Sequence, residues 1–483
     1  MEWFTADGYW LSRLVFQRSL AAVYLVAFVA AALQFRALIG SRGMLPVPDL
    51  LRRTSWRDAP GLFRLHYSDR FFALAAWTGA AVSVALLACL DARLPLGAAM
   101  VLWAVPWVLY LSIVQVGQVW YGFGWESLLL ETGFLAVFLG NADTAAPVLV
   151  LWLLRWLLFR VEFGAGLIKI RGDECWRKLT CLEFHHETQP MPGPLSWFFH
   201  RLPRPVHRVE VAANHVTQLV VPFLLFTPQP VASAAAGLMV VTQLWLVLSG
   251  NFAWLNWLTI VLALAAVDWS PLTGPAPAQP DAPHWYEVVV IAVTALVLGL
   301  SYRPARNLVS RRQVMNRSFD PLHLVNTYGA FGSISRVRLE VVVEGTDEAV
   351  IHEGTRWLEY GFRGKPGDPR RLPRQFAPYH LRLDWMMWFA ALSPAYARSW
   401  FGPFVERLLR GDRDTLRLLR HDPFPGGPPA HIRARVFRYR FTDLRELRET
   451  GCWWDRTYVR DFMRPVARPV PLRPPPREGD DRR

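Results

Sequence analysis

RVEFGAGLIKIRGDECWRKLTCLEFHHETQPMPGPLSWFFHRLPRPVHRVEVAANH, residues 160–215, is a polar block that lies between apolar stretches of membrane length. It gathers five of the 12 histidines, two of the four cysteines, and two of the three lysines, Lys169 and Lys178. Because apolar runs precede and follow it, the block interrupts the hydrophobic part of the chain as a long polar loop. We therefore expect the functional chemistry of the protein to lie here.

The composition is that of a membrane protein with an additional soluble part. Hydrophobic residues make up 52% of the 483 residues and charged residues only 19%, a more apolar balance than in ordinary globular proteins. The formal charge of +14 on such an aromatic-rich chain indicates contact with anionic lipid headgroups. The sequence contains no nucleic-acid-binding motif. We predict the lipid bilayer, and not nucleic acid, as a partner. Scarce Lys with abundant Arg, Ala and Pro is typical of a GC-rich bacterial genome, which would place the chain in a bacterial inner membrane.

About nine membrane spans, plus or minus one, are predicted within residues 1–300. A spanning helix needs about 20 mostly apolar residues to cross about 30 Å of hydrocarbon. The stretch 126–140 is short, so it either spans the membrane or inserts halfway. The predicted spans are 19–39, 71–90, 96–119, 126–140, 147–163, 209–226, 231–248, 252–267 and 286–300.

Several of these apolar stretches contain charged residues. An unpaired ionisable group at membrane depth costs about 2.5 kcal/mol or more, so these side chains should face the interior of the helical bundle. Arg155 and Glu162 are seven residues apart and share a helix face, which would let them meet Glu126, Glu131 or Gln115 on neighbouring helices. Two interpretations remain open: ion pairs that orient helices, and a pathway for a lipid or another substrate. The predicted buried charges are Glu126, Glu131, Arg155, Arg160 and Glu162.

From residue 301 onward the hydrophobic runs shorten to strand length. Partial alternation predicts strands at 335–344, 356–363 and 432–441. Short apolar or amphipathic runs predict helices at 383–392, 404–409 and 414–419. The predicted fold class is thus a polytopic α-helical membrane bundle followed by a β-rich domain with short helices. The bundle covers residues 1–300 and includes the polar loop 160–210; the soluble domain covers 301–464; a disordered Pro- and Arg-rich tail covers 465–483.

The segment GAGLIKIRGDECWRKLTCLEFHHETQPMPGPLSWFFHRLP, residues 164–203, resembles the signature region of the lipase maturation factor family of polytopic membrane proteins. Further similarity lies in YGAFGSISRVR (328–338), WLEYGFRGKPGD (357–368) and DPFPGGPPAHIRARVFRY (422–439). Together these segments extend the resemblance to about residues 10–462. It implies a chaperone-like, membrane-resident factor that helps secreted lipases, its clients, to fold and assemble.

Two arguments give opposite orientations in the membrane. With nine spans, the Arg-rich loops 40–70 and 160–208 and the C-terminal domain lie on one face, opposite the N-terminus. The positive-inside tendency places this face in the cytoplasm. The resemblance places it outside, because vertebrate members sit in the endoplasmic reticulum membrane with the C-terminal domain in the lumen. We adopt the orientation that the resemblance implies.

A shorter segment supplies a competing hypothesis. AGLIKIRGDECW, residues 165–176, resembles the corresponding segment of vitamin K-dependent carboxylases, in which a lysine matching Lys169 is the base that acts on a hydroquinone. Partial desolvation at the end of an apolar helix would lower the pKa of this lysine and make it a usable base. The other interpretation is a structural one, in which the ammonium either snorkels to the interface or pairs with neighbouring groups. The alternative function is therefore a membrane enzyme that uses Lys169, with His185 and His186 nearby, on a lipid-soluble cofactor.

The main hypothesis needs no catalytic residue and no cofactor. The sequence has no GxSxG, P-loop, HExxH or GxGxxG motif in a suitable context, so we do not expect a lipase or another conventional enzyme. Prolines stiffen the segment after His186 into an extended loop that would either contact a client or have a structural role. The residues assigned to this loop and its approach are Arg171, Asp173, Trp176, Glu187, Thr188, Gln189, Pro190, Pro192 and Trp197.

The cysteines and histidines of the block allow more than one interpretation. Cys175 and Cys181 could close a short disulfide loop in an oxidising compartment or remain two buried thiols, and their spacing is not the CxxC of redox catalysts. Adjacent histidines such as His185 and His186 diverge on most backbones and do not match the paired spacings of zinc ligands. We therefore predict no metal site.

Overall fold

Prolines mark the beginnings of six helices in the described N-terminal part of the chain. The prolines that directly precede a helix are Pro46, Pro95, Pro147, Pro203, Pro230 and Pro283. Proline suits this position because its φ is already near the helical value and its missing N–H has no partner to lose there. Such prolines convert the long apolar sequence into separate helices joined by short links.

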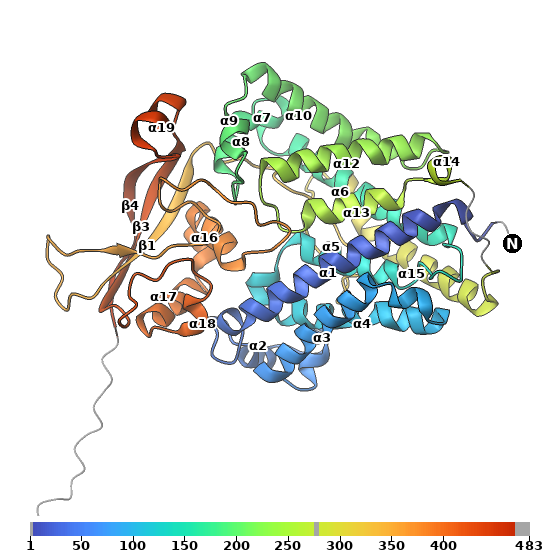
Figure 1. Cartoon of the computed structure of the whole chain (residues 1–483), viewed down its shortest axis with the longest axis horizontal. Coiled ribbons are helices and arrows are strands. Elements are labelled where there is room, and N and C mark those ends of the chain that lie inside the picture. The colour runs from blue at the N-terminus through green and yellow to red at the C-terminus, as the bar shows by residue number, and fades with distance from the viewer. Residues whose placement is uncertain (1–2, 275–279, 469–483) are drawn as a thin grey trace, which may run out of the picture.

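The computed structural model describes residues 3–274 and 280–468, with the helical part at one end and a sheet at the other (Figure 1). The N-terminus lies at the end of the helical part that is far from the sheet (Figure 1). The helices of the N-terminal part are α1 Trp10–Leu38, α2 Val47–Arg53, α3 Asp69–Leu87, α4 Leu96–Val116, α5 Gly124–Ala136, α6 Val148–Arg171, α7 Glu174–Arg177, α8 Leu182–Thr188, α9 Ser196–His200, α10 Arg204–Leu219, α11 Val221–Leu224, α12 Val231–Ser249, α13 Leu255–Ala265, α14 Ser270–Thr273 and α15 His284–Val309.

Five helical segments within the described ranges are long and apolar enough to cross a membrane: Asp7–Leu38, Asp69–Leu87, Leu96–Val116, Val231–Ser249 and His284–Val309. Their outer faces are apolar as well. Leu238, Val241 and Leu244 on α12, for example, are between 43% and 63% exposed. Exposed apolar side chains on a long helix are the surface that hydrocarbon covers in a bilayer.

The predicted count of nine spans is not confirmed. Helices α5 and α13 have 13 and 11 residues, which is shorter than the hydrocarbon thickness requires. Helix α6 has 24 residues but carries four buried ionisable side chains whose partners lie on other segments. Helix α10 begins at Arg204, five residues before the predicted span, and its first half is polar. Helices α5, α6 and α13 are largely buried in the bundle, whereas α10 packs on it with one face and exposes the other.

The C-terminal part contains a small antiparallel sheet in the order β2-β1-β3-β4. Three of its strands overlap the predicted ones, and the predicted helices coincide with α16, α17 and α18. The strand β4 was missed because its sequence lacks regular alternation and contains Pro465. The elements are β1 Arg338–Thr346, β2 Leu358–Glu359, α16 Arg382–Leu392, α17 Phe401–Leu409, α18 Arg413–Leu416, β3 His431–Phe441, α19 Leu444–Thr450 and β4 Trp454–Ala467.

The predicted tail at 465–483 begins too early. Strand β4 extends through Ala467, where it still pairs with His431 of β3. Backbone pairing to a neighbouring strand therefore orders residues that composition alone assigned to the tail. The remainder of the tail, 469–483, lies outside the described residues.

The first buried carboxylate of α5, Glu126, joins the helical part to the C-terminal part. It accepts a hydrogen bond from Arg382 Nη1 at 2.6 Å, and Nδ1 of His380 lies 3.4 Å away. The hydroxyl of Tyr110 on α4 also donates to it. All four side chains are fully buried. Burial, assisted by the charge of Arg382, lowers the pKa of His380 to about 4, so a neutral imidazole faces the ion pair at neutral pH.

The second carboxylate, Glu131, makes an equivalent connection one turn later. It forms an ion pair with Arg160 of α6. Its Oε2 accepts hydrogen bonds from the backbone N–H of Asn326 at 3.0 Å and from the hydroxyl of Tyr328 at 2.7 Å. Arg160 in turn donates to the carbonyl oxygen of Asn326 at 2.7 Å. The expected buried ion pairs are thus present, but they bind the segment after α15 as well as neighbouring helices.

Arg155 and Glu162 do not meet the α5 carboxylates or Gln115, contrary to the prediction. They share a face of α6 as expected, but that face is turned toward the other side of the bundle. Arg155 donates to the Tyr9 hydroxyl at 2.6 Å and to the carbonyl oxygen of Leu225 at 3.2 Å. Glu162 accepts from amide groups on α10 and α12, those of Gln218 at 3.2 Å and Gln243 at 2.8 Å. The side chain of Gln115 donates to the carbonyl oxygen of Pro321.

Loss of the Glu126–Arg382 pair should destabilise the whole protein. The Arg382→Leu variant leaves a buried carboxylate without its cation, which costs about 3–5 kcal/mol of unfolding free energy. We expect a loss of this size in denaturant unfolding of the purified chain in detergent micelles. The matched control is Arg410→Leu, which removes an exposed i,i+4 pair with Glu406 and should change stability by at most about 0.5 kcal/mol. Equal losses in the two variants would contradict the assignment.

Candidate functional site

The polar block, 160–215, comprises the end of α6, the three short helices α7, α8 and α9, and most of α10. Asp173 begins α7 by accepting a hydrogen bond from the backbone N–H of Cys175 at 3.0 Å. It also binds Arg336 Nη2 at 2.7 Å, and this hydrogen bond holds the pKa of the Asp173 carboxyl below its usual value. Cys175 and Cys181 form a disulfide with their Cα atoms 4.8 Å apart. The disulfide and the cap fix the turn between α7 and α8.

Arg338 at the start of β1 holds the loop that follows α8. Its guanidinium donates to the carbonyl oxygens of Glu187 at 2.9 Å, of Gln189, and of Pro190 at 3.1 Å. Its charge is balanced by Glu340 at 2.6 Å. The Arg338 side chain is fully buried, so these contacts are made away from water. These hydrogen bonds hold the backbone of the proline-stiffened loop against the sheet.

Other side chains of the loop reinforce this attachment. Glu187 Oε2 accepts from the backbone N–H of Phe441 at 2.7 Å, while burial raises the pKa of the Glu187 carboxyl. The indole N–H of Trp197 donates to the carbonyl oxygen of Thr442 at 2.9 Å. Gln189 Nε2 donates to the carbonyl oxygen of Ser249 at the end of α12 at 2.8 Å. The loop therefore joins the sheet to the helical part.

The structure places most of the residues assigned to this loop in the interior. Arg171 is exposed and hydrogen-bonds to Gln313, whereas Asp173 and Glu187 are partly exposed. The others are buried, so they can act as structural residues but present little surface to a client. The buried members are Trp176, Thr188, Gln189, Pro190, Pro192 and Trp197.

A cavity of about 850 Å³ lies between the block, α6, α10, α12 and the segment before β1. Aromatic and aliphatic side chains form most of its wall. The polar groups that reach it include Glu162, Lys169, His185, His186 and Glu210. Such a largely apolar cavity with a few polar groups is typical of a small-molecule or lipid pocket.

Lys169 is buried in the wall of this cavity at the end of α6. Its Nζ donates to the side-chain oxygens of Asn214 at 2.8 Å and Gln218 at 2.9 Å, and lies 4.9 Å from the ring centre of Trp176. The snorkelling interpretation is therefore wrong, because helix α10 covers the ammonium. His185 packs against Phe331, and burial lowers its pKa to about 3. The three residues of the alternative catalytic set line one cavity, although no geometry among them defines a reaction.

Sequence analysis missed the residues that hold the block in place. Arg336 and Arg338 lie in the stretch 335–344, whose partial alternation of polar and apolar residues predicts a strand. These two charges lie close in sequence to Glu340 of β1, and charges within an otherwise apolar strand must be paired. Their presence could therefore have indicated buried ion pairs at the start of β1. His207 precedes the predicted start of α10 at residue 209. Glu210 and Asn214 lie within the predicted span 209–226, but no local pattern indicates which residues they face.

Comparison with known proteins identifies two consecutive domains. The lipase maturation factor transmembrane domain matches residues 11–273, and the lipase maturation factor C-terminal domain matches residues 324–464. These matches cover most of the chain and both of its structural parts.

The chain belongs to the lipase maturation factor family.

Its similarity to members of the family extends over nearly the whole chain. It is 43% identical to lipase maturation factor 1 of Bos taurus, covering 96% of this chain and 90% of the relative. It is 41% identical to lipase maturation factor 1 of Homo sapiens (95% and 88%) and 30% identical to lipase maturation factor 2 of Gallus gallus (94% and 81%). No solved structure matches. These relatives give no support to the alternative of a carboxylase-type enzyme, and the apolar helices agree with a membrane-associated protein.

The disulfide should be detectable and stabilising. Alkylation of the denatured, non-reduced chain should modify Cys89 and Cys452 alone, and all four cysteines after reduction, as counted by mass spectrometry. Replacing Cys175 and Cys181 together by Ser should lower the unfolding free energy by about 2 kcal/mol, because the bridge closes a short loop in the unfolded chain. The double replacement of Cys89 and Cys452 is the matched control. Four alkylated cysteines before reduction would refute the pairing.

Proposed function

We propose that the chain is a membrane-resident maturation factor that binds partly folded secreted lipases and favours their folding and assembly. The observation that carries this proposal is the 43% identity to a lipase maturation factor over 96% of the chain, which includes the helical part and the sheet. A chaperone-like mode of action is supported by the site itself. The loop after α8 is held by hydrogen bonds to the sheet on one side and to the end of α12 on the other. Among its described side chains we find no nucleophile paired with a base, which a covalent step would require.

The client surface that we propose is the outer edge of strand β4. This strand pairs only with β3 among the described elements, and most of its side chains are exposed. Tyr458, Val459 and Val466 are each between 43% and 49% exposed. An unpaired strand edge with apolar side chains can take up an extended client segment by strand addition.

The register of β4 limits what this edge can bind. Its pairing with β3 shifts at three places, one of them between the pairs Val436↔Arg460 and Phe437↔Tyr458, so Val459 is the extra residue of a bulge. Bulges bend a strand and interrupt its ladder. The edge therefore favours short client segments and resists pairing with a second copy of itself.

We propose that the sheet and the polar block lie outside the cytoplasm. The Cys175–Cys181 disulfide supports this orientation, because structural disulfides persist in oxidising compartments. The corresponding space is the lumen of the endoplasmic reticulum in the vertebrate members and, for a bacterial chain, the outer side of the inner membrane. Secreted lipases fold in such compartments, so the client surface and the client would meet there.

Maturation should depend on the β4 edge. In cells that lack their own maturation factor and produce a secreted lipase, the chain should increase secreted lipase activity. Val459→Lys together with Val466→Lys places charges on the apolar edge, and we expect activity per amount of chain to fall about fivefold, equivalent to about 1 kcal/mol of client binding. Leu444→Lys on α19 is the matched control, since Leu444 is 56% exposed but lies off the edge.

Two outcomes of this experiment decide between hypotheses. Full activity of the double β4 variant would reject the proposed client surface without affecting the family assignment. Loss of maturation in Lys169→Met, with normal amounts of folded chain, would instead reject passive binding and favour chemistry at Lys169. We expect the maturation level of Lys169→Met to follow its folded amount.

The orientation can be tested with the natural free cysteines. Cys452 lies two residues before β4, next to the sheet. Cys89 follows α3 and lies near Arg18, at the end of α1 that is far from the sheet. In sealed bacterial cells, a membrane-impermeant maleimide should label Cys452 and should label Cys89 only after permeabilisation. Cys452→Ser and Cys89→Ser identify the labelled site. Labelling of Cys89 alone in sealed cells would establish the reverse orientation.

A further inference from the structure

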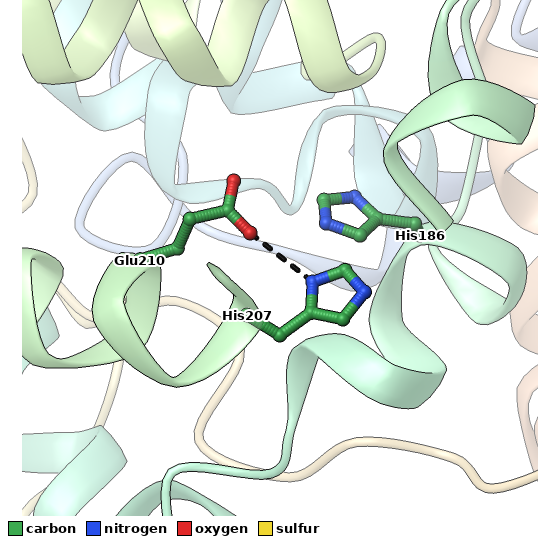
Figure 2. A group of neighbouring side chains, drawn as sticks. All are labelled: His186, His207 and Glu210. Atoms are coloured by element: carbon green, nitrogen blue, oxygen red, sulfur yellow. Dashed lines mark hydrogen bonds and ion pairs between the residues drawn. The ribbon is translucent and has the colours of Figure 1, made fainter. Parts of the chain in front are cut away.

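Three potential metal ligands converge where α8 approaches the first turn of α10. His186 comes from α8, and His207 and Glu210 come from α10 (Figure 2). One ligand atom from each side chain lies within 4.8 Å of those of the other two. His207 and Glu210 are three residues apart, so they share a face of α10 and point toward the same space. Figure 2 shows the imidazole of His186 directed at this pair.

Among the described residues, the side chain of His186 has no hydrogen-bond partner. Both of its ring nitrogens are buried and unpaired, and the residue is 3% exposed. The Nε2 of His207, which is 2% exposed, is also unpaired. A buried polar atom without a partner costs about 1–3 kcal/mol, so such atoms in native proteins usually have a ligand, ion or water. The approach of His207 to Glu210 is accounted for by their hydrogen bond of 3.1 Å, whereas no hydrogen bond accounts for the position of the His186 ring.

We propose that His186, His207 and Glu210 form a binding site for a divalent transition-metal ion, best suited to Zn²⁺, that links α8 to α10. Two imidazoles and one carboxylate form a zinc ligand set that leaves a fourth position open. Nitrogen ligands disfavour Ca²⁺ and Mg²⁺, which take oxygen ligands. The adjacent pair His185–His186, which spacing argued against, is not the site. In the folded chain, His186 instead lies beside His207 and Glu210, which are 21 and 24 positions later in the sequence.

The surroundings satisfy further requirements of such a site. The indole N–H of Trp245 donates to Glu210 Oε1 at 2.8 Å, while Oε2 would exchange its hydrogen bond with His207 Nδ1 for the ion. His186 and Glu210 both line the cavity of about 850 Å³, which gives an ion access and leaves room for a water or another ligand at the open position.

Closing the site requires the side chains to move. In a tetrahedral site, two ligand atoms at about 2.0–2.2 Å from one zinc ion lie about 3.4 Å apart. The present limit of 4.8 Å among the ligand atoms therefore requires them to approach by up to about 1.4 Å. Side-chain rotation is the movement that we propose for this approach. The inference does not depend on the proposed lipase function, because it concerns the ion alone.

The test uses the full chain purified in detergent without a polyhistidine tag and stripped of metal by a chelator. Titration with Zn²⁺, followed by elemental analysis after desalting, should give one equivalent per chain. Co²⁺ should give the visible absorption of a four-coordinate site with nitrogen ligands. His186→Gln and His207→Gln should each weaken Zn²⁺ binding at least about 100-fold, and Trp245→Phe, which removes only the outer hydrogen bond, about 10-fold to 100-fold.

His185→Gln is the matched control, because His185 is the buried neighbour of His186 on the same helix and is not among the three ligands. It should retain one equivalent of Zn²⁺ at unchanged affinity. If His186→Gln does not fold, the unfolding midpoint provides a second readout. Zn²⁺ should raise the midpoint of the unmodified chain and should raise that of Trp245→Phe by less. Absence of stoichiometric binding in the unmodified chain, or equal binding by His186→Gln and His185→Gln, would overturn the proposal.

Discussion

Two carboxylates buried in the interior of α5 constrain the rest of the structure. Glu126 and Glu131 cannot remain charged in an apolar bundle unless cations and hydrogen-bond donors reach them. Helix α6 supplies one cation, and the C-terminal part supplies the other, Arg382, from 256 positions away. The helical part and the C-terminal part therefore share a polar interior, and the requirement to pair these charges fixes how one part lies on the other.

The polar block occupies the junction that this pairing creates. Arg338 satisfies three carbonyl oxygens of the loop after α8, and Trp197 packs in a cluster with Tyr439 and Trp454 of the sheet. A loop bound on both sides has few free groups to offer a partner. The more accessible apolar surface of the C-terminal part is the edge of β4, which supports a division between a braced junction and a separate client surface.

The cavity and the cluster of His186, His207 and Glu210 both lie at this junction. Helix α10 contributes to both, since Asn214 holds Lys169 while His207 and Glu210 face His186. The disulfide lies in the same block and restrains the turn that leads into α8. Covalent, polar and proposed metal contacts thus act on one short segment and together restrict its motion.

The sequence by itself determined the class of the protein, the position of the polar block, several of the long apolar helices and three of four strands, because length, composition and periodicity are local properties. The family was indicated by the resemblance of particular segments, above all 164–203, to known members. The sequence did not determine the partners of the buried charges: Arg155 and Glu162 share the predicted helix face, yet only packing decided that this face meets α10 and α12. The same holds for His186, whose neighbours on α10 become visible only when the helices pack. Contacts between distant residues arise from tertiary structure, and local patterns carry no record of them.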